Sequence, residues 1–227
     1  MKRGWFFILL LSGFLTAYSQ SFIQPNYGLK SHETLEISKV EVTSGGTSFH
    51  MSIENRIKGG TFCADRNIYM ICPDGTKSKL LSASGIPVCP DSYKFNVTGE
   101  KLEFVLLFPQ LKEGTAWVDL VEECSENCFS FYGITLDNEL NRKINESFAL
   151  AESEEASKAV ISLIDLVGQI ENKNYGIEGL LYLTIVKLAD EAGIRTLAGE
   201  WFRKMKSSGA PRLQLYLKNL ESQGIKY

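Results

Sequence analysis

The hydrophobic period of the chain changes near residue 138, and this change limits the fold more than any other feature of the sequence. Before it, apolar and polar residues alternate, as in the run from Phe49 to Ile53, which is the two-residue period of a half-buried strand. After it, apolar residues recur at spacings of three and four, the period of one helix face. We therefore predict an α+β chain, with an all-β domain over 34–137 and a helical domain over 138–227.

The β domain divides into short predicted strands separated by turn-forming residues. Gly45-Gly46 predicts a hairpin turn, and a slip in the apolar phase predicts a β-bulge near Ser38-Lys39. About seven or eight strands with no helix between them favour a two-sheet, immunoglobulin-like sandwich, with an open barrel as the alternative. The clearest strand patterns cover 34–43, 49–53, 68–72, 77–81, 102–108, 117–121 and 129–136.

The helical domain shows successive apolar faces broken by helix-stopping residues. One face runs from Val160 to Ile170, and a second runs from Leu180 to Ala189 and ends at Gly193. A third helix is predicted over Ile194–Met205. The break at Ser208-Gly209-Ala210-Pro211 separates it from a fourth helix, predicted over 212–220.

Two short segments of the helical domain repeat at an offset of about 38 residues. Leu150-Ala151-Glu152 recurs as Leu188-Ala189-Asp190, and Ala159 recurs as Ala198. This pattern resembles tetratricopeptide repeats, which pair antiparallel helices and bind peptides or proteins. The resemblance covers about 80 residues but lacks the family's fuller tryptophan, glycine and tyrosine pattern. A plain bundle of helical hairpins is the alternative.

Three phrases of the β domain carry a second resemblance. Phe108–Thr115, Val118–Glu122 and Tyr132–Leu136 look like a signature of accessory β-sandwich domains in secreted proteins of Gram-negative bacteria. The resemblance spans about 30 residues, brings no catalytic residues with it, and implies a domain that precedes a functional partner domain. The cysteine pair between the last two strands departs from that pattern.

The first residues have the form of a secretory signal peptide. Lys2 and Arg3 precede an apolar run over Trp5–Leu15, and Ala17-Tyr18-Ser19 forms a small-x-small cleavage signal. The run is too short for a membrane span, which needs about twenty apolar residues. We expect a signal peptide over 1–19 and an N-terminal arm over 20–33, in a secreted or periplasmic protein without a membrane span after cleavage. A buried N-terminal helix is the alternative.

An oxidising compartment makes disulfides the default for the five cysteines. Cys63 and Cys89 lie beside turn-rich segments, and Cys124 and Cys128 share a polar turn. Cys72 ends an apolar run, which favours a buried free thiol. We therefore favour the pairs Cys63–Cys89 and Cys124–Cys128.

A redox role for the Cys124 and Cys128 pair is the alternative to a structural one. Redox pairs usually occupy C-x-x-C at a helix N-terminus, where the dipole lowers one thiol pKa. Here a predicted strand follows at Phe129. Because no helix begins at these cysteines, we favour a structural disulfide. A zinc site would need a second close cysteine pair, which the sequence lacks.

Composition and motifs exclude several classes of function. The chain is 44% hydrophobic and 22% charged, which argues against disorder, and its net charge of −3 gives no footprint for nucleic acid. No phosphate loop, nucleophile elbow, metal-protease motif or dinucleotide fingerprint is present. We expect no enzymatic activity, no metal and no cofactor.

A cluster of cations and aromatic residues near the C-terminal end is the predicted partner-binding surface. Cations at helix ends also complement the helix dipole, which is the alternative explanation. We predict a non-enzymatic module that binds a protein or peptide, and the alternative is an extracytoplasmic thiol-redox accessory protein. The predicted surface comprises Trp201, Arg203, Lys204, Arg212 and Tyr216.

Overall fold

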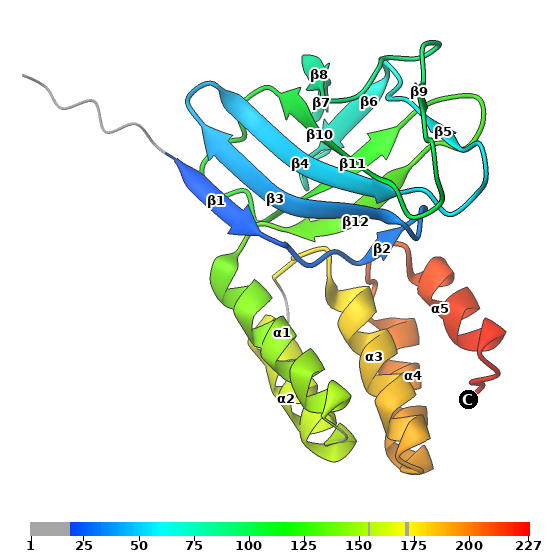
Figure 1. Cartoon of the computed structure of the whole chain (residues 1–227). Coiled ribbons are helices and arrows are strands. Elements are labelled where there is room, and N and C mark those ends of the chain that lie inside the picture. The colour runs from blue at the N-terminus through cyan, green and yellow to red at the C-terminus, as the bar shows by residue number, and fades with distance from the viewer. Residues whose placement is uncertain (1–18, 154, 171–172) are drawn as a thin grey trace, which may run out of the picture.

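The computed structural model describes residues 19–153, 155–170 and 173–227. Within these ranges the chain is α+β, as predicted, with twelve strands followed by five helices (Figure 1). Apart from Ser19, the predicted signal peptide lies outside the described residues. No helix in the described part of the chain is both long enough and apolar enough to cross a membrane.

Sheet A is antiparallel and has the strand order β1-β3-β4-β10-β8. Its longest strands alternate buried and exposed residues, which is why the sequence pattern locates them. Strands β3 and β4 form a hairpin at the predicted turn. A register shift between Ile37 and Lys39 confirms the predicted bulge. The strands are β1 (Gln20–Ile23), β3 (Leu35–Thr43), β4 (Gly46–Glu54), β10 (Lys101–Phe108) and β8 (Ser82–Ser84).

Sheet B is also antiparallel, with the order β2-β12-β11-β6-β7. Both sheets contribute apolar side chains to one buried core, in which Phe49 and Phe108 meet edge to face at 5.5 Å. The strands of sheet B are β2 (Leu29–Lys30), β12 (Ser130–Thr135), β11 (Trp117–Glu122), β6 (Ile68–Ile71) and β7 (Lys77–Lys79). Strands β5 (Thr61–Phe62) and β9 (Tyr93–Lys94) form a separate small pair.

The segment predicted as an N-terminal arm takes part in both sheets. Its β1 pairs with β3 of sheet A, and its β2 pairs with β12 of sheet B. The segment 24–28 joins these two strands and therefore crosses from one sheet to the other (Figure 1).

The helices form a second apolar core next to the sheets. The carboxylate of Asp137 caps α1 by accepting the N–H of Leu140 at 2.9 Å. Gly193, in the left-handed region at a φ of 74°, follows the end of α3, as predicted. The helices are α1 (Asn138–Glu152), α2 (Ala156–Ile170), α3 (Glu178–Glu191), α4 (Arg195–Ser207) and α5 (Leu213–Ser222).

The helices lie against the edge of the sheets where β2 and β12 meet them (Figure 1). The indole Nε1 of Trp117 donates to the carbonyl of Asn174 at 2.9 Å. Gly133 and Gly176 approach so closely that a Cβ on Gly133 would overlap the carbonyl of Gly176. Glycine is needed at this contact because no side chain fits between the two backbones.

Candidate functional site

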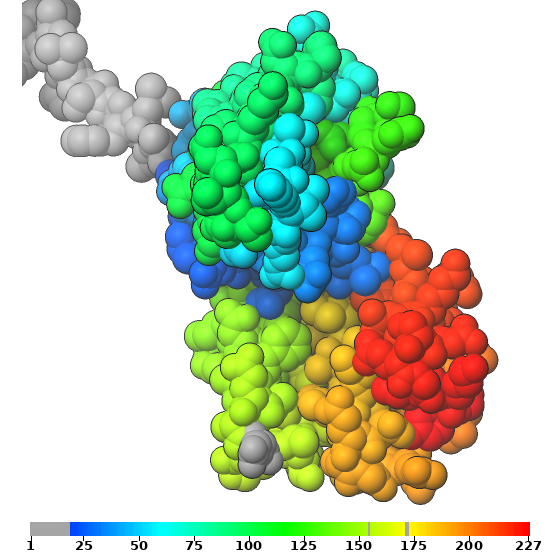
Figure 2. All heavy atoms as spheres, turned by 45° about the vertical axis from the view of Figure 1, so that its right-hand side comes forward, coloured from blue at the N-terminus to red at the C-terminus, as the bar shows by residue number. Residues whose placement is uncertain are grey.

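A cleft of about 700 Å³ lies at the junction between the sheets and the helices. Its walls come from the segment 24–30, from β3 and β4, and from helices α1, α3 and α5. Figure 2 shows this junction, where the N-terminal segment in dark blue borders the helices in green and yellow. We call this hollow the junction cleft.

The segment 24–30 is a fixed wall of the junction cleft because α1 and β12 both hold it. The main-chain N–H of Asn26 donates to Oδ1 of Asn141 at 2.8 Å, and its side chain donates to Oδ1 of Asn145 at 3.0 Å. The N–H of Gly28 donates to the carbonyl of Tyr132 at 2.7 Å. These bonds join residues more than 100 positions apart in sequence, so this wall exists only in the folded chain.

The charged groups of the junction cleft neutralise one another. Lys30 forms an ion pair with Glu36, and the hydroxyl of Tyr27 donates to the same carboxylate at 3.1 Å. Burial opposes the charge on Lys30, but hydrogen bonds to Glu36 and Tyr27 outweigh it and raise the pKa of Lys30. Burial raises the pKa of Tyr27. The positive charge of Lys30 and the negative charge of Glu36 therefore offset each other in the cleft.

The helical wall of the junction cleft is mainly apolar. Phe148 of α1 and Leu180 and Leu183 of α3 line it, and the exposed Asn219 of α5 stands at its rim. Tyr216 also borders the cleft, but most of its side chain is buried in the helical core. One polar wall and one apolar wall suit a ligand that has both characters.

The structure buries part of the predicted partner-binding surface. Tyr216 is 2% exposed, because its ring fills the space left by the absent side chains of Gly28 and Gly179. Burial raises the pKa of its hydroxyl. Arg212 turns toward sheet B, where its guanidinium lies 3.9 Å from the ring of Tyr132.

The other members of that predicted surface lie on α4. Trp201 is buried against Tyr182, with ring centroids 5.8 Å apart. Lys204 stacks over the indole of Trp201 at 4.6 Å, whereas Arg203 is exposed. Two of the five residues are therefore core residues, and the five do not form one continuous surface.

The structure joins the two cysteine pairs that the sequence favours, Cys63–Cys89 and Cys124–Cys128, and leaves Cys72 unpaired and half-buried. Burial raises the pKa of the Cys72 thiol, which keeps it protonated at neutral pH.

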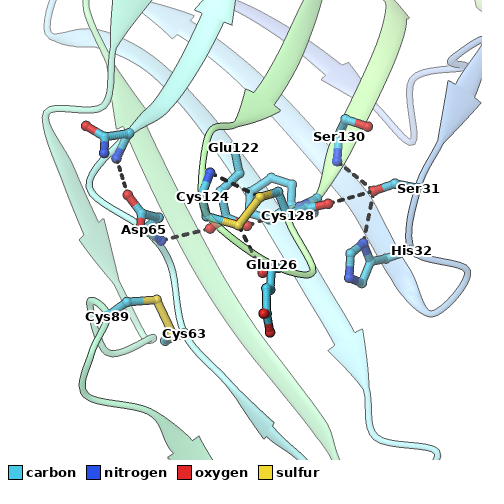
Figure 3. The surroundings of a disulfide bond; sticks show 12 residues. Ser31, His32, Cys63, Asp65, Cys89, Glu122, Cys124, Glu126, Cys128 and Ser130 are labelled. Carbon is cyan, nitrogen blue, oxygen red and sulfur yellow. Dashed lines mark hydrogen bonds between the residues drawn. A yellow bond between two sulfur atoms is a disulfide. The ribbon is translucent and has the colours of Figure 1, made fainter.

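The segment 123–128, which we call the cysteine loop, joins β11 to β12 (Figure 3). The N–H of Cys124 points to Sγ of Cys128 at 3.0 Å. Sγ of Cys124 lies 3.1 Å from the carbonyl oxygen of Glu126, a contact without a proton because a disulfide sulfur carries none. Ser31 lies beside the loop, where its hydroxyl accepts the N–H of Ser130 at 2.8 Å.

A buried carboxylate closes the base of the cysteine loop. Glu122 accepts the N–H of Asp65 at 2.8 Å and the N–H of Phe129 at 3.1 Å (Figure 3). Burial raises the pKa of Glu122. Glu123 follows directly in sequence, but its carboxylate pairs with Lys77. An acidic neighbour disfavours a thiolate, so Glu122 does not activate Cys124 or Cys128 for thiol exchange.

Within the described ranges, no group of three or more histidine, cysteine, aspartate or glutamate residues could hold a metal ion. The junction cleft could not be predicted from the sequence, because its walls come from distant segments of the chain. No protein-family model, no curated protein and no solved structure significantly matches this chain.

Proposed function

We propose that this chain is a non-enzymatic binding module whose ligand, a peptide or a segment of a protein, occupies the junction cleft. The observation that carries the proposal is the cleft itself, which at about 700 Å³ falls within the usual size of ligand sites. Its polar wall is held by hydrogen bonds at both ends, so a ligand would meet a largely formed site.

We further propose that the two facing sheets form an immunoglobulin-like sandwich, similar to accessory domains of secreted Gram-negative proteins. The helices α1 to α4 form two hairpins and would correspond to two tetratricopeptide-like repeats. Buried alanines support this reading, because Ala159 and Ala198 are fully buried at equivalent places in the second helix of each hairpin. Two repeats are too few for a stable solenoid, so their docking on the sheets would replace the missing neighbours.

An extracytoplasmic location, secreted or periplasmic, is part of the same proposal. The signal-like residues 1–19 and the two disulfides support it. The acidic Glu122 at the base of the cysteine loop favours a structural disulfide over the alternative, a thiol-redox accessory role.

Blocking the cleft tests the proposal. Asn219→Trp places an indole at the rim of the junction cleft from an exposed position, so the fold should tolerate it. Lys218→Trp is the matched control, because Lys218 is the exposed neighbour and does not line the cleft. Linear peptides selected from a display library on the whole chain should bind the Lys218→Trp variant and lose at least about tenfold in affinity for Asn219→Trp. Equal binding to both variants would place the binding surface elsewhere.

A further inference from the structure

One edge of sheet A is open within the junction cleft. Strand β3 pairs with β4 from Leu35 to Thr43, interrupted only by the bulge at Ser38. On its other side, β1 pairs only with the residues from Lys39 to Val42. In the described part of the chain, the first four residues of β3 therefore have no strand neighbour on that side.

The register shows which main-chain groups face this open side. The N–H of Glu54 donates to the carbonyl of Thr34, so Thr34 faces β4. Residues of an antiparallel strand alternate in direction, so Leu35 and Ile37 face away from β4. The contacts of Leu35 agree, because its carbonyl accepts the Nζ of Lys30 at 3.1 Å on the open side.

The main chain of Ile37 is the part of this edge that stays unpaired. Its neighbours are satisfied, since the carbonyl of Ser38 accepts the N–H of Gln24 at 2.9 Å and that of Leu35 accepts Lys30. The place of Ile37 in the register turns its N–H and carbonyl away from β4, and among the described residues no main-chain bond outside the strand ladders reaches them. Ile37 nevertheless lines the junction cleft while its side chain lies in the core, so its main chain is what borders the cleft. Main-chain groups left unpaired near the interior are costly and rare.

We propose that the ligand of the junction cleft is an extended peptide segment that adds to the edge of β3, exchanging main-chain hydrogen bonds with the N–H and carbonyl of Ile37. This is strand addition, in which main-chain bonds give affinity and neighbouring pockets select side chains. Phe148, Leu180 and Leu183 select an apolar side chain. The Lys30–Glu36 pair is already balanced, so the segment is uncharged. The proposal rests on the proposed function, because it assigns the binding mode of the same cleft.

Amide hydrogen exchange of the free, whole chain tests the edge without any ligand. The amide of Ile37 should exchange at least about tenfold faster than that of Glu36, whose register position bonds it to β4. An Ile37 amide as protected as Glu36 would show that the edge is closed, and would overturn the inference while leaving the proposed function intact.

N-methylation of the selected peptides tests the main-chain pairing. We take a selected peptide that binds the Asn219→Trp variant poorly and methylate its backbone nitrogens one at a time. Methylation should weaken binding at least about tenfold at one position and have little effect at the next. The bound peptide should also protect the Ile37 amide. Peptides that tolerate every N-methyl group would overturn strand addition but not the cleft as the site. If every selected peptide binds the Asn219→Trp variant as tightly as the unchanged chain, both strand addition and the cleft as the binding site are overturned.

Discussion

Asp119 and Arg212 form an ion pair across the junction between sheet B and the helices, and the carboxylate of Asp119 is almost completely buried. The same carboxylate accepts the N–H of Gly133 at 2.8 Å, and the guanidinium lies over the ring of Tyr132. Arg212 itself has a φ of 58° just before α5, so the chain takes a left-handed conformation at this contact. This pair fastens the start of the last helix to a central strand.

Arg212→Ala should therefore lower the free energy of unfolding by about 3 kcal/mol, because it leaves the buried carboxylate of Asp119 without its counter-charge. Urea denaturation at neutral pH measures this loss. Arg203→Ala, which removes an exposed arginine from α4, is the control and should change stability by less than about 0.5 kcal/mol. A similar effect of both variants would mean that the ion pair contributes little.

Gly133→Ala should loosen the helices from the sheets. Gly133 has a φ of 66° and no room for a Cβ beside Gly176, whereas Gly75 has a φ of 82° and open space around it. Gly75→Ala should cost about 1–2 kcal/mol, the penalty of a left-handed alanine. Gly133→Ala carries the same penalty plus the overlap, so its loss in urea denaturation should be clearly larger. Equal losses would show that the backbones can separate without cost.

The two disulfides should differ in their contribution to stability. Cys63 and Cys89 are 26 residues apart, and Cys124 and Cys128 are 4 apart. In the chain-entropy model, the double serine variants should lose about 3.5 and about 2 kcal/mol respectively. Thermal denaturation of both variants checks the order. A larger loss from the short loop would indicate that it stabilises more than its own residues, for instance the contact with Ser31.

Glu122 should make the stability depend on pH. Its pKa is raised above the ordinary value of 4.5, so the folded chain holds this proton more tightly than the unfolded chain. The stabilisation from the proton is complete in acid and is lost as the pH rises through the raised pKa. The stability of the wild type relative to Glu122→Gln should therefore fall between pH 4.5 and neutral pH. The stability of the wild type relative to Glu123→Gln, a change at an exposed neighbouring residue, should show no such fall.

Glu122→Gln should also destabilise the chain at neutral pH, by about 1–3 kcal/mol. The carboxylate accepts two N–H groups, from Asp65 and Phe129, and an amide can accept only one while its own NH₂ faces the other. A variant as stable as the wild type would mean that the base of the cysteine loop rearranges freely.

The long elements could be predicted because their own residues carry the signal. Strands β3, β4 and β10 have eight or nine residues and alternate clearly, and even the bulge near Ser38 appears as a slip in that alternation. Strands β1, β2, β5, β8 and β9 have only two to four residues and were missed, although β6 and β7, which are equally short, were predicted. Pairing with distant partners defines them, not their local pattern.

The candidate site could not be predicted for a related reason. Tyr216 and Arg212 look like surface residues in sequence, but each is turned inward by a partner far away in the chain. Tyr216 can turn inward only because Gly28 has no side chain, and Arg212 turns inward because it pairs with the carboxylate of Asp119. The open edge at Ile37 is a main-chain property and leaves no trace in the choice of side chain.

The link between Asn26 and Asn141 has a consequence for the order of events during synthesis. These residues are 115 positions apart, and β2 likewise can pair only after β12 is present. Well over half of the polypeptide must be present before the segment 24–30 can contact these residues. Long-range closure of this kind slows folding. The earliest residues of this segment would thus remain available to chaperones until α1 has emerged.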